Sequence, residues 1–512
     1  MHSPQAVDRR RPAAWGTENA IYGTGHETSS ATHPPFFSRA RIVARPGFNR
    51  WLVVPCALAI HLCIGEVYAF SVFKIPLTQT IGVDVAAAGD WTQGQIASIF
   101  SIAIVFLGLS AAVFGKWVER AGPRASGSVS ACCWGSAFLI GALAISIHDI
   151  WLLRLGYGVI GGCGLGIGYI TPVSTLIRWF PDRRGLATGL AIMGFGGGAF
   201  IASPLSKWLM DVYSTPTSNG VIPAFVTLGV VYLAVMISGA LCFRVPRPGW
   251  KPEGYVETAP ARGHLRTSRS VSPGEAIKTP QFYLLWVVLL LNVTAGIGIL
   301  EQASPMIQDL FPGRVAAGGA AAFVMLLSLF NMGGRFFWSW SSDSLGRKRT
   351  YAVFFLLGPL MYCVIPTAGA DGSLYLFVLA TCVIISMYGG GFATIPAYLS
   401  DVFGTRNVGA IHGRLLTAWS VAGVLGPLLV NGIRERLIVQ GVAPADAYTP
   451  TMYLMAGLLV VALVADLLVK PVAAKHYLPE DDGEVAAAPP PGGVPQAAPQ
   501  AAAVPQAADA EP

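Results

Sequence analysis

The chain contains twelve apolar stretches, each long enough to cross a lipid bilayer as a helix, and this repetition restricts the fold more than any other feature. A spanning helix needs about 20 apolar residues. The stretches lie near residues 51–73, 94–114, 124–146, 150–176, 185–210, 222–243, 282–303, 316–340, 349–368, 373–398, 408–433 and 450–470. Only 12% of the residues are charged, whereas a soluble chain carries about a quarter. Because backbone groups inside lipid must pair internally, we predict an all-α polytopic membrane protein.

A short loop motif occurs twice and indicates an internal duplication. Residues 115–124 (GKWVERAGPR) and 339–348 (SWSSDSLGRK) both carry an acid, a glycine three residues later and a basic cluster. The offset is residue 339 minus residue 115, or 224. The same offset relates two glycine pairs, which are Gly185 with Gly189 and Gly409 with Gly413. Two motifs at one spacing predict two pseudo-symmetric six-helix bundles, with a binding site between the repeats, as in two-bundle carriers.

Basic residues predict the orientation of the chain in the membrane. They gather before the first stretch, in the long central connection and in both repeat loops, which are therefore expected on the cytoplasmic side of the cytoplasmic (inner) membrane. The net charge of +7 follows from this topology, so no nucleic-acid partner is expected. The expected parts are a mostly disordered cytoplasmic tail (1–50), a first bundle (51–243), a cytoplasmic central loop (244–280), a second bundle (281–470) and a disordered, cytoplasmic Ala/Pro-rich tail (471–512).

The sequence carries no catalytic or metal-binding motif. It lacks HExxH, a Walker-type lysine loop and a nucleophile elbow. A glycine pattern at 156–161 matches a dinucleotide fingerprint, but it lies inside an apolar stretch, where small residues serve close helix packing. The eight cysteines fall within apolar stretches without CxxC spacing. We therefore predict a protein that is not an enzyme, has no cofactor or metal, and works as a monomer in the lipid bilayer.

Arg335 is the strongest candidate for a functional residue. It precedes Asp343, which is expected at the cytoplasmic boundary, by eight residues, so it lies about 12 Å deep at 1.5 Å per residue. The half-thickness of the hydrocarbon core is about 15 Å, so Arg335 lies near the midplane, where charges are rare and functional by default. Its planar guanidinium pairs a carboxylate through two hydrogen bonds, which predicts an anionic substrate. The alternative is an arginine satisfied by helix carbonyls or by a fixed acid.

Two ionisable residues of the first stretch are candidates for proton coupling. His61 lies near mid-depth, and Glu66 lies further outward. A histidine titrates near neutral pH and can carry a coupled proton. The alternatives are a histidine bonded to a neighbouring carbonyl group, and a glutamate that neutralises Arg335 in the empty site or faces a packed interface.

Other charged residues have a gating or secondary role in this interpretation. Arg414 and His412, in the cytoplasmic third of the eleventh stretch, are candidates for a secondary cation or a gate, and snorkelling is the alternative. The two repeat loops are predicted to latch the cytoplasmic side in one state; topology and folding alone are the alternative. The loop residues concerned are Glu119, Arg120, Arg124, Asp343, Arg347 and Lys348.

With these features, the sequence resembles the major facilitator superfamily over about residues 50–470. Within it, five stretches are similar to the oxalate/formate antiporter family, relatives of the monocarboxylate carriers. They are residues 68–76 (YAFSVFKIP), 178–189 (RWFPDRRGLATG), 279–282 (TPQF), 330–338 (FNMGGRFFW) and 401–404 (DVFG). The resemblance implies twelve helices, alternating access and small organic anions as substrates.

The resemblance also implies roles for particular residues. Arg335 falls on the family's substrate-binding arginine, and four positions that line the cavity keep aromatic residues, which are Tyr68, Tyr169, Tyr388 and Phe392. The chain departs from the oxalate carrier at Leu415, where that carrier has a second cation, a lysine. Arg414 is adjacent but about 100° round the helix, so it does not simply substitute.

The predicted function is secondary active transport of a small organic anion. One fixed cation suits a monocarboxylate, so lactate, pyruvate or formate moves ahead of oxalate, with the anion moved by proton symport or by anion exchange. The alternatives are an oxalate or other dicarboxylate antiporter, a carrier of another solute such as a drug, and a non-transporting sensor with the same fold. A membrane enzyme is the weakest alternative, because no catalytic constellation is present.

Overall fold

The computed structural model describes residues 35–83, 85–255 and 265–479, and these residues form twelve helical spans as predicted. The first bundle contains α1 (Val53–Ile64), η3 (Gly65–Phe73), α2 (Lys74–Leu77), α3 (Gln93–Ala121), α4 (Pro123–Ser146), α5 (Ile150–Leu153), η4 (Arg154–Gly161), α6 (Gly162–Trp179), α7 (Arg184–Tyr213) and α8 (Val221–Cys242). The second contains α10 (Pro280–Leu310), α11 (Ala317–Leu345), α12 (Arg347–Ala370), α13 (Leu374–Phe403), α14 (Val408–Leu415), α15 (Thr417–Val439) and α16 (Thr449–Leu468). Apart from three isolated bridges, the described residues contain no β-structure.

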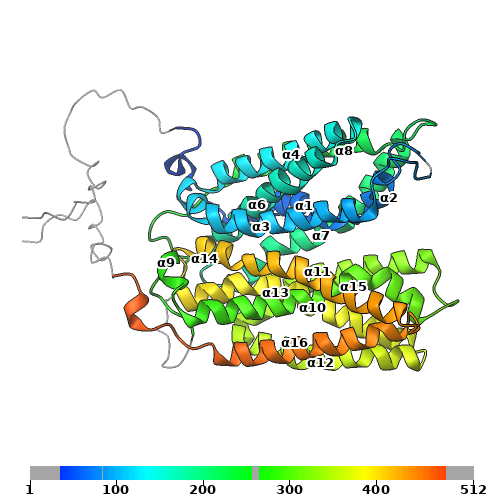
Figure 1. The fold of residues 1–512 in the computed structure, drawn as a ribbon. Coiled ribbons are helices and arrows are strands. Elements are labelled where there is room, and N and C mark those ends of the chain that lie inside the picture. Colours follow the sequence, from blue (N-terminus) through cyan, green and yellow to red (C-terminus); the bar gives the residue numbers. More distant parts are fainter. Residues whose placement is uncertain (1–34, 84, 256–264, 480–512) are drawn as a thin grey trace, which may run out of the picture.

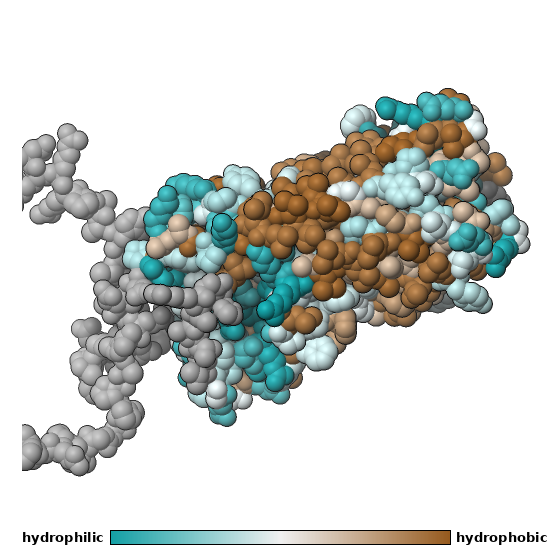
Figure 2. All heavy atoms as spheres, turned by 90° about the horizontal axis from the view of Figure 1, so that it is seen from below, coloured by the Kyte–Doolittle hydropathy of each residue, from teal (hydrophilic) through white to brown (hydrophobic). Residues whose placement is uncertain are grey.

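The two bundles lie side by side with their helix axes roughly aligned (Figure 1). On the face shown in Figure 2, hydrophobic residues form a broad belt over the middle of the helices, and hydrophilic residues gather toward the ends. This distribution is that of a membrane protein, with an apolar surface wherever lipid tails make contact. We call the end that carries α9 (Pro273–Ala276), the start of α1 and the end of α16 the basic end. The two repeat loops, whose basic residues predict the orientation in the membrane, lie at this end.

The repeated loop motif requires its glycine for conformational reasons. Gly122 has φ 82° and joins α3 to α4, and Gly346 has φ 87° and joins α11 to α12. Residues with a side chain avoid positive φ, whereas glycine adopts it at little cost. The two loops therefore turn the chain in the same way at equivalent positions of the two bundles, which explains the motif in physical terms.

Three of the described spans are interrupted along their length. The first changes from α-helix to 3-10 helix at Gly65, and the fourth contains a π-helical segment, η4. The eleventh ends as α14 at Leu415 and resumes as α15 at Thr417. Such irregular turns shift the faces that the following residues present. Tyr68 and Trp419 follow two of these interruptions, so their orientation does not follow from regular helical spacing.

The described chain packs against the basic end beyond the expected bundle boundaries. Ala44 N donates a hydrogen bond of 2.9 Å to Val245 O, and Leu478 N donates one of 2.8 Å to Ser270 O. The second tail was expected to begin at 471, yet residues through 479 pack on the bundle, because the start of the tail is held by the central connection. The tail segments predicted to be disordered over 1–34 and 480–512 lie outside the described residues.

Candidate functional site

Arg335 lies between the two bundles with its side chain fully buried. Its exposed fraction is 0%, and its Nε donates a hydrogen bond of 3.0 Å to Asn331 Oδ1 one turn earlier in α11. Neither terminal nitrogen of the guanidinium has a hydrogen-bond partner among the described residues. A Cβ at Gly196 of α7 would lie 2.7 Å from Arg335 Cδ, so this glycine lets the first bundle's backbone approach the arginine. The result is a buried cation with its two terminal donors available.

Aromatic rings from both bundles surround this guanidinium. Its central carbon lies 5.7 Å from the Phe195 ring centre and 5.2 Å from that of Phe392. Trp419 packs 4.5 Å from Phe392 and 5.5 Å from Phe195. The Tyr68 and Tyr388 hydroxyls lie 3.3 Å apart and link the bundles. We call Phe195, Phe392, Trp419 and the tyrosines Tyr68, Tyr169 and Tyr388 the cage.

The cage contains all four aromatic residues that the resemblance implies. Tyr169 packs 5.4 Å from Trp419, and its hydroxyl has no hydrogen-bond partner among the described residues. The Trp419 Nε1 donor is likewise unpaired within the described chain. Together with Arg335, these two groups provide several buried hydrogen-bond donors without acceptors. Buried polar groups normally have partners, so the cage has the chemistry of a site for an anion.

Sequence reasoning did not identify three residues of this site, namely Phe195, Trp419 and Asn331. The two aromatic residues lie in apolar stretches, where they resemble lipid-facing or core residues. Asn331 had a usable signal, because it precedes Arg335 by four residues and so shares its helix face.

The His61 ring packs beside the cage, 5.4 Å from the Tyr169 ring and 6.4 Å from the Phe195 ring, and its two nitrogens lie against backbone carbonyl groups. Its Nδ1 contacts Ala191 O, and its Nε2 lies 3.1 Å from Tyr169 O. This corresponds to the alternative of a carbonyl-bonded histidine. Glu66 accepts a hydrogen bond of 3.0 Å from Tyr157 inside the first bundle, and the described residues show no ion pair between Glu66 and Arg335. No contact among the described residues therefore supports the alternative in which Glu66 neutralises Arg335.

His412 and Arg414 point to different surroundings. His412 is fully buried, lies 5.8 Å from the Tyr169 ring, and has two ring nitrogens without partners among the described residues. Arg414 instead donates to Pro273 O of α9 at the basic end. Of these two candidates for a second cation, only His412 lies beside the cage.

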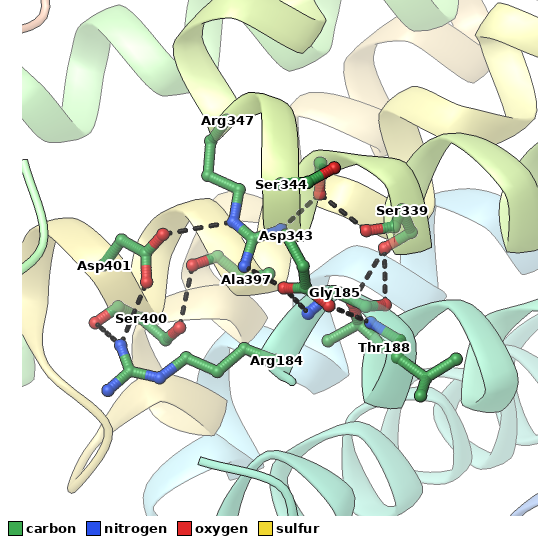
Figure 3. Close-up of polar contacts among 12 residues, drawn as sticks. Arg184, Gly185, Thr188, Ser339, Asp343, Ser344, Arg347, Ala397, Ser400 and Asp401 are labelled. Carbon is green, nitrogen blue, oxygen red and sulfur yellow. Dashed lines mark hydrogen bonds and ion pairs between the residues drawn. The ribbon is translucent and has the colours of Figure 1, made fainter. Parts of the chain in front are cut away.

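The acid of the second repeat loop binds the start of a helix in the opposite bundle (Figure 3). Asp343 accepts hydrogen bonds of 2.8 Å from both Gly185 N and Leu186 N, and these are free donors of the first turn of α7. Ser339, one turn earlier in α11, lies 3.0 Å from the Thr188 hydroxyl. Helix N-termini carry unpaired N–H groups and a positive dipole end, so a carboxylate is well placed here.

The acid of the first repeat loop makes the equivalent contact in reverse. Glu119 Oε1 accepts from Gly409 N at 2.9 Å and from Ala410 N at 3.3 Å, at the start of α14. Glu119 and Asp343 are related by the offset of 224, as are Gly409 and Gly185. Each bundle therefore places its loop acid on a helix start of the other bundle.

The basic loop residues differ in what they contact. Arg347 Nη2 binds Asp343 at 2.6 Å, and its Nε binds Asp401 at 3.1 Å. Asp401 also binds Arg184 of the first bundle at 3.0 Å, so this row of charged side chains crosses from one bundle to the other (Figure 3). We call this contact between the bundles at the basic end the seam. Two other basic residues stay within their own half, since Arg124 donates to Phe36 O and Lys348 to Val469 O. Arg120 is exposed.

A comparison of the sequence with known families agrees with the structure, which has two repeated halves, a seam at the basic end and a buried arginine. The model of the Major Facilitator Superfamily matches residues 56–427. The chain belongs to this superfamily. This facilitator is thus an integral membrane transporter and not an enzyme, as the sequence predicted.

Several relatives of this facilitator carry carboxylates according to their names. The oxalate:formate antiporter of Oxalobacter formigenes is 28% identical, over 75% of this chain and 85% of that protein. The apicoplast pyruvate carrier 1 of Toxoplasma gondii is 25% identical, over 71% and 80%. Human monocarboxylate transporter 11 is 25% identical, over 75% and 77%. The crystal structure of FucP in the outward conformation matches 82% of this chain and all of that chain with a TM-score of 0.59 at 15% identity, which shows the shared fold alone.

Proposed function

We propose that this facilitator transports a small monocarboxylate, of the lactate, pyruvate or formate type, across the cytoplasmic membrane by alternating access. The observation that carries the proposal is Arg335, buried between the bundles with both terminal nitrogens unpaired among the described residues. A carboxylate accepts two parallel hydrogen bonds from such a fork. The rings of Phe195 and Phe392 lie beside the guanidinium and would pack against the carbon skeleton of a small acid.

Anion exchange is favoured over proton symport by the surroundings of Arg335. Its hydrogen-bonded partner, Asn331, is neutral, and no carboxylate pairs with the guanidinium among the described residues. A buried, unpaired charge costs several kcal/mol, so the empty carrier would reorient slowly. A bound monoanion removes that charge and permits reorientation, which makes each half-cycle depend on an anion. His61, held by two carbonyl groups, then serves the packing of the first bundle.

Uptake of labelled lactate into proteoliposomes tests both parts of the proposal. Vesicles are preloaded with lactate, pyruvate, formate, oxalate or no anion, and each set is measured with and without an inward proton gradient. We expect uptake to require a preloaded monocarboxylate and to be unchanged by the proton gradient. Accumulation driven by the gradient in vesicles without anion would contradict exchange.

Substitution of the arginine tests the site itself. Arg335→Gln removes two charge-assisted hydrogen bonds, each worth about 1.5–3 kcal/mol, and should reduce uptake at least about 100-fold. Arg335→Lys keeps the charge without the fork and should retain a small part of the activity. Arg314→Gln removes an exposed arginine from the opposite end and controls for charge loss. Normal uptake by well-folded Arg335→Gln would remove the arginine from the binding role.

Exchange of a dicarboxylate remains the second candidate because of His412. This imidazole lies beside Tyr169 with unpaired nitrogens, and its protonated form would supply a second positive charge for oxalate. We expect oxalate to compete weakly at pH 7.5. Oxalate that competes as strongly as lactate in the unmodified protein, and weakly in His412→Gln, would favour the dicarboxylate instead.

A further inference from the structure

The cage contains a hydrogen-bond donor that the pairing of a carboxylate with Arg335 leaves unused. It is the indole N–H of Trp419, a residue that is 0% exposed. Phe195 and Phe392 lie beside the guanidinium, with ring centres 5.7 and 5.2 Å from its central carbon. The same two rings lie 5.5 and 4.5 Å from the ring of Trp419. The guanidinium and the indole are therefore flanked by the same two side chains, and both face the surroundings of an anion bound to Arg335.

The Trp419 N–H differs from the other deeply buried indole donors because it has no acceptor among the described residues. Trp134 and Trp179 are comparably buried, at 0% and 1% exposed. Trp134 donates to Cys63 O at 3.1 Å, and Trp179 donates to Arg244 O at 2.8 Å. A buried donor without an acceptor lowers stability, and most such groups in proteins are paired. Packing alone therefore does not account for an indole at this position.

The chemistry of the unpaired donors restricts the ligand. Both terminal nitrogens of Arg335 and the indole nitrogen of Trp419 donate hydrogen bonds and accept none, and all three lack acceptors within the described chain. The two oxygens of a carboxylate pair with the two terminal nitrogens as a fork. The indole then requires a third oxygen. On a small acid, the carbon next to the carboxylate, C2, is the nearest atom that can carry it.

We propose that Trp419 determines substrate specificity by donating its indole N–H to an oxygen on C2 of the transported acid. The inference rests on the proposed transport function and narrows its substrates to 2-oxo and 2-hydroxy acids. A keto oxygen and a hydroxyl oxygen both accept a hydrogen bond, so pyruvate and lactate both satisfy the indole. Formate and propionate leave it unpaired, and a buried site binds a ligand more weakly when the ligand leaves one of its donors unpaired.

The competing arrangement is an indole that shares one oxygen of the carboxylate with Arg335, since each carboxylate oxygen has two lone pairs. In that arrangement no oxygen on C2 is needed, and acids with and without it bind equally well. Removal of the indole N–H then weakens every acid to the same extent. The two arrangements therefore differ in how acids of the same size compete with one another.

Competition among three acids with one carbon skeleton tests the inference. Exchange of labelled lactate in proteoliposomes is inhibited with unlabelled pyruvate, lactate or propionate at neutral pH, where all three are anions. In the unmodified protein, we expect the inhibition constant of propionate to exceed the other two at least about tenfold. Trp419→Phe keeps an aromatic ring and removes the N–H. In this variant we expect pyruvate and lactate to weaken at least about tenfold, and propionate to stay unchanged.

Trp134→Phe is the matched control, because it removes an equally buried indole N–H that has its own acceptor in the first bundle. It should leave the ratio of the propionate and pyruvate constants unchanged. Equal inhibition by propionate and pyruvate in the unmodified protein would overturn the inference, and this result needs no variant to fold. Equal weakening of all three acids in Trp419→Phe would also overturn it. Both results leave the transport proposal intact, whereas absence of lactate exchange in the unmodified protein would refute that proposal and this inference together.

Discussion

Asp343 binds Gly185 across the seam between the bundles, with 2.8 Å between its carboxylate oxygen and the glycine N–H. The second oxygen takes the next N–H, that of Leu186, at the same distance. The carboxylate thus satisfies two free donors of α7 and lies at the positive end of its dipole. Glu119 makes the matching contact with Gly409 at 2.9 Å. Each acid of the repeat motif therefore caps the N-terminus of a helix in the other half, and this gives a physical reason for the motif.

The first prediction concerns Asp343→Asn. Asparagine replaces one carboxylate oxygen by an NH2 donor and carries no charge, so one of the two N–H groups of α7 faces a donor, and the ion pair with Arg347 is lost. Loss of a charged hydrogen bond costs about 1–3 kcal/mol, which shifts the seam toward the open state roughly 5- to 150-fold. Faster maleimide labelling of Ala410→Cys from the basic end would report this shift. Asp371→Asn, an exposed acid at the opposite end, should leave labelling unchanged, and an equal effect of both variants would refute the latch.

The second prediction uses two glycines of the same helix. A Cβ at Gly185 would lie 2.0 Å from the backbone oxygen of Ser339, which cannot move aside, whereas a Cβ at Gly189 meets its nearest atom at 3.2 Å. Gly185→Ala should therefore prevent closure of the seam and abolish exchange. Gly189→Ala should keep at least about a third of the activity, because small shifts relieve its contacts. Exchange assays on both variants, at matched expression, test this prediction. If Gly185→Ala remained active, closure of the seam would not be required for exchange.

The architecture was predictable because it follows from strong, repeated signals. Twelve apolar stretches dictate twelve helices, since lipid offers the backbone no partners, and the 224-residue offset dictates two equivalent halves. The acids and glycines of the motif were identified, but their partners were not. Gly185 and Gly409 were recognised as a repeated pair, yet nothing in a linear sequence says that the helix starts they mark receive acids from the opposite half.

The cage was only partly predictable. The depth of Arg335 followed from its distance to the loop, and family resemblance supplied Tyr68 and Tyr169. Trp419 was missed because α14 ends at Leu415, so helical spacing from His412 or Arg414 does not carry across the break. Phe195 was missed because an aromatic residue in an apolar stretch has the same sequence signature whether it faces lipid or a buried guanidinium.

The third prediction concerns His61→Leu, which replaces the imidazole by a side chain without a hydrogen-bond donor. The structure places its two ring nitrogens against Ala191 O and Tyr169 O, and a neutral imidazole donates its one N–H to one of these oxygens. Its removal leaves that buried acceptor without its donor. The expected cost is about 1–3 kcal/mol of stability, visible as a lower melting temperature in detergent. Exchange per folded molecule should persist, because the proposed cycle moves no proton through this group. Loss of exchange at unchanged stability would instead give His61 a role in transport and would favour proton symport over anion exchange.

The fourth prediction tests how Arg335 is positioned without altering it. A Cβ at Gly196 would lie 2.7 Å from Arg335 Cδ and Nε, and these atoms belong to a flexible side chain that yields before the backbone does. Gly196→Ala should therefore fold normally but displace the guanidinium, and a misplacement near 1 Å costs up to about 100-fold in activity. Gly333→Ala is the matched control, since a Cβ there meets nothing within 4 Å and alanine favours the helix by about 1 kcal/mol. Lactate exchange should show a higher KM in Gly196→Ala alone. Equal kinetics in both variants would mean that the close approach of α7 does not position the arginine for its substrate.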